Sequence, residues 1–145
     1  MRVLIATLLL CAACGGRPHW SGDPELFGVL LVVNADPGMP AFVSAPDFHD
    51  RFKRDLELSA RYFGHDPAEL AGLRIVLQSD WLSGEKIGAY RPDDTTIVVA
   101  VRDFPCLGAT ALSHEVLHYF ILDRNHTDPR WLTFGPLAQS IGCTS

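Results

Sequence analysis

Residues 95–122, TTIVVAVRDFPCLGATALSHEVLHYFIL, decide the fold. The first seven, Thr95 to Val101, are dominated by β-branched side chains, which are typical of a buried strand. After Pro105 comes an apolar run from Leu107 to Leu122 that is long enough for a helix. We therefore expect a strand followed by a buried helix.

The sequence before this stretch predicts two more strands and one long helix. Phe27 to Val33 and Leu73 to Gln78 are short apolar runs, and Phe48 to Phe63 carries apolar residues at helical spacing. Residues 79–94 are polar and rich in Gly, Pro and Asp, which predicts a loop, and a short helix is expected near 137–141. The fold class is α+β: a small sheet of about three or more strands, with a long helix and a second, buried helix packed on it.

Length and composition fit one compact domain. The chain has 145 residues, of which 48% are hydrophobic and 20% charged, so a disordered chain and a coiled coil are excluded. The formal net charge is −5, and basic residues alternate with acidic ones. We therefore expect no nucleic-acid partner.

The N-terminus has the pattern of a secretion signal. Arg2 precedes an apolar run that is too short to span a bilayer, and small residues follow it. The end of this run, Cys11-Ala12-Ala13-Cys14, resembles the lipobox of bacterial lipoproteins, which implies a lipid on Cys14. The expected organisation is a signal peptide at 1–13, a lipidated Cys14 and tether at 14–25, and one domain at 26–145. The expected location is the bacterial cell envelope, with the membrane as a partner through that lipid.

This interpretation leaves Cys106 and Cys143 in the mature chain. An oxidising compartment favours a disulfide between them, and the alternative is two buried thiols. Neither belongs to a Cys-x-x-Cys pair, which disfavours a role as metal ligands.

Within the second helix lies an H-E-x-x-H motif, His114-Glu115-Val116-Leu117-His118. Residues four apart lie on one face of a helix, so His114 and His118 can bind one zinc ion. With six His and five Glu in the chain, chance produces such a motif about 0.01 times. Buried imidazoles and a buried carboxylate are costly without a ligand, and a metal ion removes that cost.

A catalytic zinc site needs a third protein ligand and an open position for water. His126 is the preferred candidate because Asn125 favours a turn that returns the chain to the metal. Asp128 and Asp123 are the alternatives, although a continuing helix would point Asp123 away from the histidines. Either aspartate could instead hold a ligand imidazole in place.

With this motif and a strand before it, residues 95–131 resemble the zincin metallopeptidases. His114, Glu115 and His118 match the zincin motif one for one, and the late His126 resembles the metzincins, but its spacing differs from theirs. The resemblance implies a zinc peptidase fold in which Thr95 to Val101 is the edge strand that pairs with an extended peptide or protein substrate. It also implies that Glu115 is the general base for zinc-activated water. The alternatives are a non-catalytic zinc- or peptide-binding lipoprotein and a zinc-free domain.

Overall fold

A computed structural model describes residues 20–80, 88–101 and 111–133. The strands and α-helices are β1 (Leu30–Val33), α1 (Phe48–Tyr62), β2 (Arg74–Gln78), β3 (Gly88–Arg91), β4 (Thr96–Ala100) and α2 (Ala111–Ile121). Among the described residues there are also four short 3-10 helices: η1 (Pro24–Leu26), η2 (Ala41–Ser44), η3 (Pro67–Leu70) and η4 (Pro129–Thr133). The fold is α+β, as the sequence predicts.

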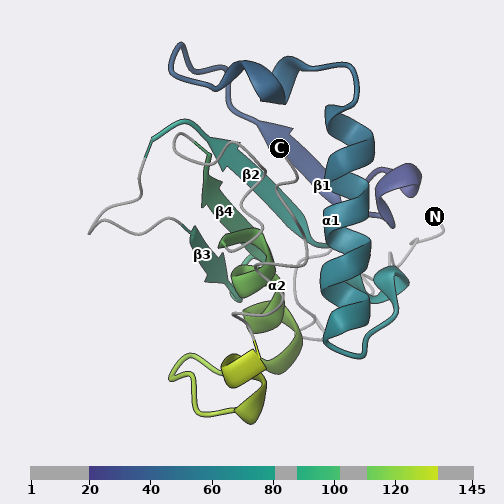
Figure 1. The fold of residues 1–145 in the computed structure, drawn as a ribbon, viewed down its shortest axis with the longest axis vertical. Coiled ribbons are helices and arrows are strands. Elements are labelled where there is room, and N and C mark those ends of the chain that lie inside the picture. The colour runs from purple at the N-terminus through teal and green to yellow at the C-terminus, as the bar shows by residue number, and fades with distance from the viewer. Residues whose placement is uncertain (1–19, 81–87, 102–110, 134–145) are drawn as a thin grey trace, which may run out of the picture.

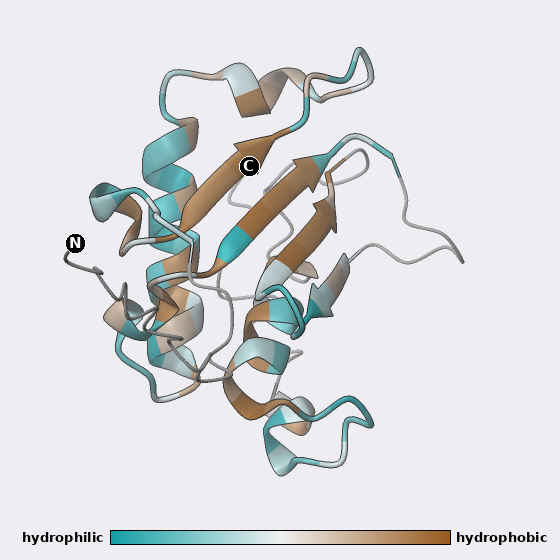
Figure 2. Cartoon of the chain, turned by 180° about the vertical axis from the view of Figure 1, so that it is seen from behind, coloured by the Kyte–Doolittle hydropathy of each residue, from teal (hydrophilic) through white to brown (hydrophobic). Residues whose placement is uncertain are grey.

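The sheet has the strand order β1-β2-β4-β3. β1, β2 and β4 are parallel, and β3 is antiparallel to β4. Both α-helices lie over the same face of this sheet (Figure 1). Seen from the other side, β1 and most of β2 and β4 are apolar, whereas β3 is not (Figure 2).

The core lies between the sheet and the two helices. It joins Ile75 and Leu77 of β2 to Phe52 and Leu56 of α1 and to Val116 of α2. A hydrogen bond of 2.8 Å between the buried Ser59 and Ser113 hydroxyls also links α1 to α2. Since α2 is fixed by this core, the motif that it carries has a rigid support.

The structure corrects two of the predictions about strands. β3 lies inside the segment 79–94 that was predicted to be a loop, and it pairs with β4 from Gly88↔Val99 to Arg91↔Thr96. The strand predicted at Thr95–Val101 is β4, but it lies between β2 and β3 and is not an edge strand. The edge next to α2 is β3. Its sequence is short and shows no apolar alternation, so only its pairing with β4 reveals it as a strand.

Residues 20–25, which fall inside the predicted tether, pack on the body. The Trp20 indole donates to the Asp94 carbonyl at 2.8 Å, and the Arg74 guanidinium lies over the Trp20 ring at 5.1 Å. Asp23 and Val29 form an isolated bridge that flanks η1. If Cys14 carries a lipid, the tether that leads from it therefore has to lie before Trp20.

Several predictions fall outside the described residues. These are the signal peptide, the lipid on Cys14, the pair Cys106 and Cys143, the short helix near 137–141 and the start of the second helix before Ala111. In the part of the chain that is described, no helix is long and apolar enough to cross a membrane.

Candidate metal centre

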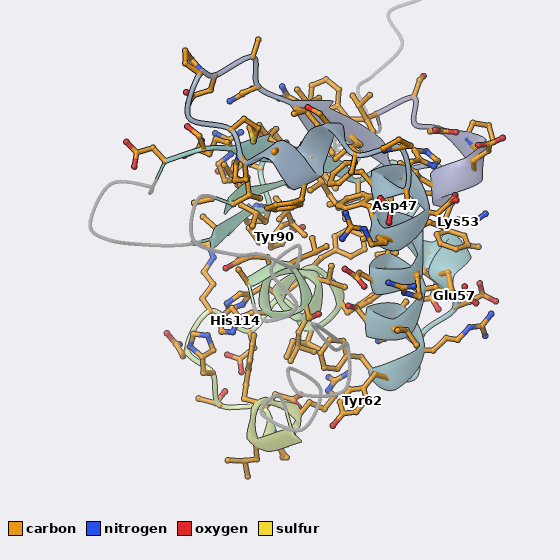
Figure 3. The ribbon with its side chains drawn as sticks, turned by 45° about the horizontal axis from the view of Figure 1, so that its top comes forward. Asp47, Lys53, Glu57, Tyr62, Tyr90 and His114 are labelled. Atoms are coloured by element: carbon orange, nitrogen blue, oxygen red, sulfur yellow. The ribbon has the colours of Figure 1, made fainter. Side chains whose placement is uncertain are left out.

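Three histidines meet at the end of α2. His114 and His118 lie one turn apart on the helix, and His126 returns from the loop that follows it. One ring nitrogen from each residue lies within 4.8 Å of the others, and Nε2 of His126 is 3.0 Å from Nε2 of His114. The three ring nitrogens are imidazole donors that converge on one point, and imidazole nitrogens are common ligands of zinc. Figure 3 shows His114 beside α2, on the side away from α1.

Burial keeps the helical histidines in the form that binds metal. Burial, together with the neighbouring His118 and His126, lowers the pKa of His114 to about 4. It also lowers the pKa of His118, which a hydrogen bond to the Asp123 carbonyl partly offsets. Both rings are therefore neutral near pH 7, with a lone pair available for a cation.

The tautomer of His118 is set by the main chain. Its Nδ1 lies 2.8 Å from the carbonyl oxygen of Asp123, which can only accept, so Nδ1–H is the donor. The proton on Nδ1 leaves Nε2 of the same ring as the acceptor. This arrangement is the one found for metal-binding histidines, whose second nitrogen donates to a carbonyl or carboxylate.

α2 ends three residues after the motif. Its last residue is Ile121, and Leu122 follows with a left-handed φ of 54°. His126 also has a left-handed φ, of 56°. A left-handed residue just past a helix reverses the chain direction, so the loop turns back towards the face that carries His114 and His118.

Neither aspartate offered as an alternative ligand points at the histidines as a free carboxylate. The Asp128 carboxylate forms a two-oxygen pair with Arg130, with Nε to Oδ1 and a terminal nitrogen to Oδ2 both at 2.9 Å. Arg130 thereby lowers the pKa of Asp128 to about 2. The Asp123 carboxylate accepts from groups of its own loop, and those bonds hold its pKa well below the usual range. The structure therefore brings His126, and not Asp123 or Asp128, to the pair on α2.

Glu115 is 6% exposed and lies against the edge strand. A Cβ placed on Gly88 of β3 would approach Glu115 Oε1 to 2.8 Å and Cγ to 2.9 Å. The Glu115 side chain thus occupies the space that the absence of a side chain at Gly88 leaves beside α2. The H-E-x-x-H motif identifies Glu115 from the sequence. The contact between Glu115 and Gly88 could not be predicted, because the two residues are 27 positions apart.

Trp131 is a second residue whose role at this site only the structure shows. Its ring contacts the rings of all three histidines, with centroid distances of 4.8 Å to His114, 4.6 Å to His118 and 4.3 Å to His126. It also packs with Phe63 and Leu117 in a small apolar cluster. The indole therefore separates the histidine cluster from that apolar cluster.

A second group that could hold a metal ion consists of Asp23, Glu25 and His49. Both carboxylates are on exposed residues, and His49 Nε2 already pairs with Asp23 Oδ2 at 3.1 Å. Asp23 Oδ1 accepts the Glu25 N–H at the start of η1. These contacts describe an N-terminal cap with an ion pair.

Comparison of the chain with models of known families, with characterised proteins and with solved structures finds no match.

Proposed function

We propose that the protein is a zinc-dependent peptidase with His114, His118 and His126 as metal ligands and Glu115 as general base. The observation that carries this proposal is the meeting of three histidine nitrogens within 4.8 Å beside the buried Glu115 of the same helix. A site that only stabilises the fold is usually closed by four ligands, whereas three ligands leave a position for water. The zincin resemblance of the motif supports the same assignment.

The chemistry divides between the metal and the chain. When bound, zinc lowers the pKa of a coordinated water towards about 7 and polarises the carbonyl group of a substrate. Glu115 accepts the proton of the water as it attacks the peptide carbonyl carbon, and then delivers that proton to the leaving amine nitrogen. Burial of Glu115 on a helix fixed by the core restricts the positions from which its carboxylate can transfer the proton.

The expected partner is an extended peptide or protein segment, and the edge at which it binds is β3. β3 is the last strand in the sheet order, and Gly88 of β3 lies against Glu115. Figure 3 shows Tyr90 of β3 close to α2. An extended substrate that added a strand to β3 would therefore run past the general base. The location that we propose, from the N-terminal sequence, is the bacterial cell envelope with a lipid on Cys14.

The test compares two variants of the chain without its first 13 residues. Glu115→Gln is expected to keep about one zinc ion per chain and to lose peptide cleavage by at least about a hundredfold, because the isosteric amide cannot accept the proton. His126→Ala is expected to weaken zinc retention, because it removes one of three ligands. Metal content is measured by atomic emission, and cleavage by mass spectrometry of a denatured protein substrate.

Cleavage by Glu115→Gln at the wild-type rate would contradict the role of Glu115. Equal zinc retention by wild type and His126→Ala would move the third ligand elsewhere. A chain that bound zinc but cleaved no substrate would instead support a non-catalytic zinc- or peptide-binding protein.

A further inference from the structure

Asp123 contacts the metal centre through two separate parts of the residue. Its main-chain carbonyl accepts Nδ1–H of His118 at 2.8 Å. Its carboxylate does not face the histidines but accepts four hydrogen bonds from the loop that follows. The donors are the N–H of Asn125 at 2.9 Å, the Thr127 hydroxyl at 3.2 Å, the N–H of Asp128 at 2.7 Å and the Trp131 indole at 2.9 Å.

These four donors enclose His126. Three of them lie within two positions of it, Asn125 before it and Thr127 and Asp128 after it, so the carboxylate holds both sides of the turn that carries the third ligand. The turn needs such support because His126 is exposed and has a left-handed φ of 56°, a conformation that is unfavourable for a residue other than glycine. A loop without these bonds would lose the conformation that brings His126 to within 3.0 Å of His114.

The fourth donor links the same carboxylate to the other side of the histidine cluster. The Trp131 indole, fixed by its N–H on Asp123 Oδ2, lies against the rings of His114, His118 and His126. One side chain therefore fixes both the loop that brings in the third ligand and the ring against which all three ligands pack.

We propose that Asp123 is a positioning residue of the metal centre, which orients His118 through its carbonyl and His126 through its carboxylate-bound loop. The inference rests on the metal centre of the proposed function. Outer groups that hold ligands of a metal usually contribute 10- to 100-fold to metal affinity. The ligands would then be arranged before the metal arrives, and the ion would not have to organise the loop.

Asp123→Asn tests the proposal because it keeps the shape of the side chain and the main-chain carbonyl but replaces one acceptor oxygen with a donor. We expect zinc to bind this variant about 10- to 100-fold more weakly in a competition titration with a chromophoric chelator. Asp128→Asn is the matched control. It makes the same change in the same loop, but among the described residues the Asp128 carboxylate accepts hydrogen bonds from Arg130 and not from a group that holds a ligand. Its affinity is expected to stay within about threefold of wild type.

Cobalt provides a readout that a general loss of fold stability would not change. With Co²⁺ in place of zinc, the visible spectrum of Asp123→Asn is expected to shift towards that of His126→Ala, and Asp128→Asn is expected to match wild type. Trp131→Phe keeps an aromatic ring but removes the indole N–H, and it is expected to weaken binding in the same direction by a smaller factor. Trp131→Phe is expected to reduce zinc affinity less in the Asp123→Asn background than in wild type, because both changes affect the hydrogen bond between the Trp131 indole and Asp123.

Wild-type affinity and spectrum in Asp123→Asn would overturn the proposal, as would an equal loss in Asp128→Asn. If Asp123→Asn does not fold, wild-type affinity in Trp131→Phe overturns it. None of these titrations needs a substrate. Weak metal binding by Asp123→Asn in a chain that cleaves no peptide would support the positioning role and refute the peptidase. Wild-type zinc affinity in Asp123→Asn, in a protein that cleaves peptides, would refute the positioning role and support the peptidase.

Discussion

At the scale of single residues, Asp55 is an ionisable group that the proposed chemistry does not use. It lies on α1 and is 7% exposed. Burial raises its pKa from 3.8 to about 6, although the charges of Arg54 and Arg51 lower it in part. The folded state therefore binds this proton more tightly than the unfolded chain, and the ionised form is the unfavourable one in the fold.

The sign of the pH dependence follows from this shift. Between about pH 4 and pH 6 the folded state holds more protons at Asp55 than the unfolded state, so this residue makes the free energy of unfolding fall as the pH rises. Asp55→Asn removes the effect. At pH 7 we expect the variant to be more stable than wild type by about 1–2 kcal/mol, and the difference to vanish near pH 4.

Urea denaturation at several pH values measures this difference. Asp50→Asn is the control, because it removes a carboxylate from the exposed side of the same helix. A stabilisation by Asp55→Asn that is the same at pH 4 and pH 7 would contradict the argument.

At the scale of elements, the contact between β3 and α2 determines where Glu115, the proposed general base, lies. The site depends on a glycine at position 88, since a Cβ there would lie 2.8 Å from Glu115 Oε1. Gly88→Ala is expected to displace the Glu115 carboxylate and to lower peptide cleavage at least about tenfold, with zinc affinity changed by only a few fold. The reason is that a buried side chain can shift only at the expense of packing, which is worth about 1–3 kcal/mol.

A double-mutant cycle on stability separates this contact from the general effect of alanine in a strand. The cost of Gly88→Ala, measured by thermal unfolding, is expected to be at least about 1 kcal/mol smaller in the Glu115→Ala background, where no carboxylate meets the new methyl group. An identical cost in both backgrounds would show that Gly88 does not constrain Glu115.

At the scale of the whole molecule, the proposed zinc ion would link α2 to the loop that leads to η4. Because the ion binds the folded chain and not the unfolded one, zinc at about 100 times its dissociation constant should stabilise the fold by about 2.7 kcal/mol. For a domain of this size we expect the melting temperature to rise by roughly 10 °C, and a chelator to reverse the rise. Differential scanning calorimetry with and without zinc measures it.

Two single changes locate the ion in that experiment. His126→Ala is expected to remove most of the rise, and His49→Ala, in the exposed Asp23–Glu25–His49 group, is expected to leave it unchanged. The opposite result would place the stabilising ion at the second group.

The sequence by itself determined the features that follow from regular spacing of side chains, namely helices, apolar strands and residues on one face of a helix. Apolar spacing predicted α1, and apolar runs predicted β1, β2 and β4, although β1 is an edge strand and only partly buried. The fold class is confirmed. The 3.6-residue period was enough to place His114 and His118 on one face of α2, because side chains four apart on a helix always lie together.

Only the tertiary structure decided the rest. β3 is a strand because it pairs with β4, and its own four residues show no pattern that would predict it. Position in a sheet is a property of neighbours, so Thr96–Ala100 could not be recognised as an inner strand from its composition. The choice of His126 over Asp123 and Asp128 depended on an irregular loop held by side-chain hydrogen bonds. Such bonds do not recur at a regular spacing along the chain, so the sequence does not predict them. The Trp131 ring, which donates to Asp123 and packs against the three histidines, takes this position only in the folded protein.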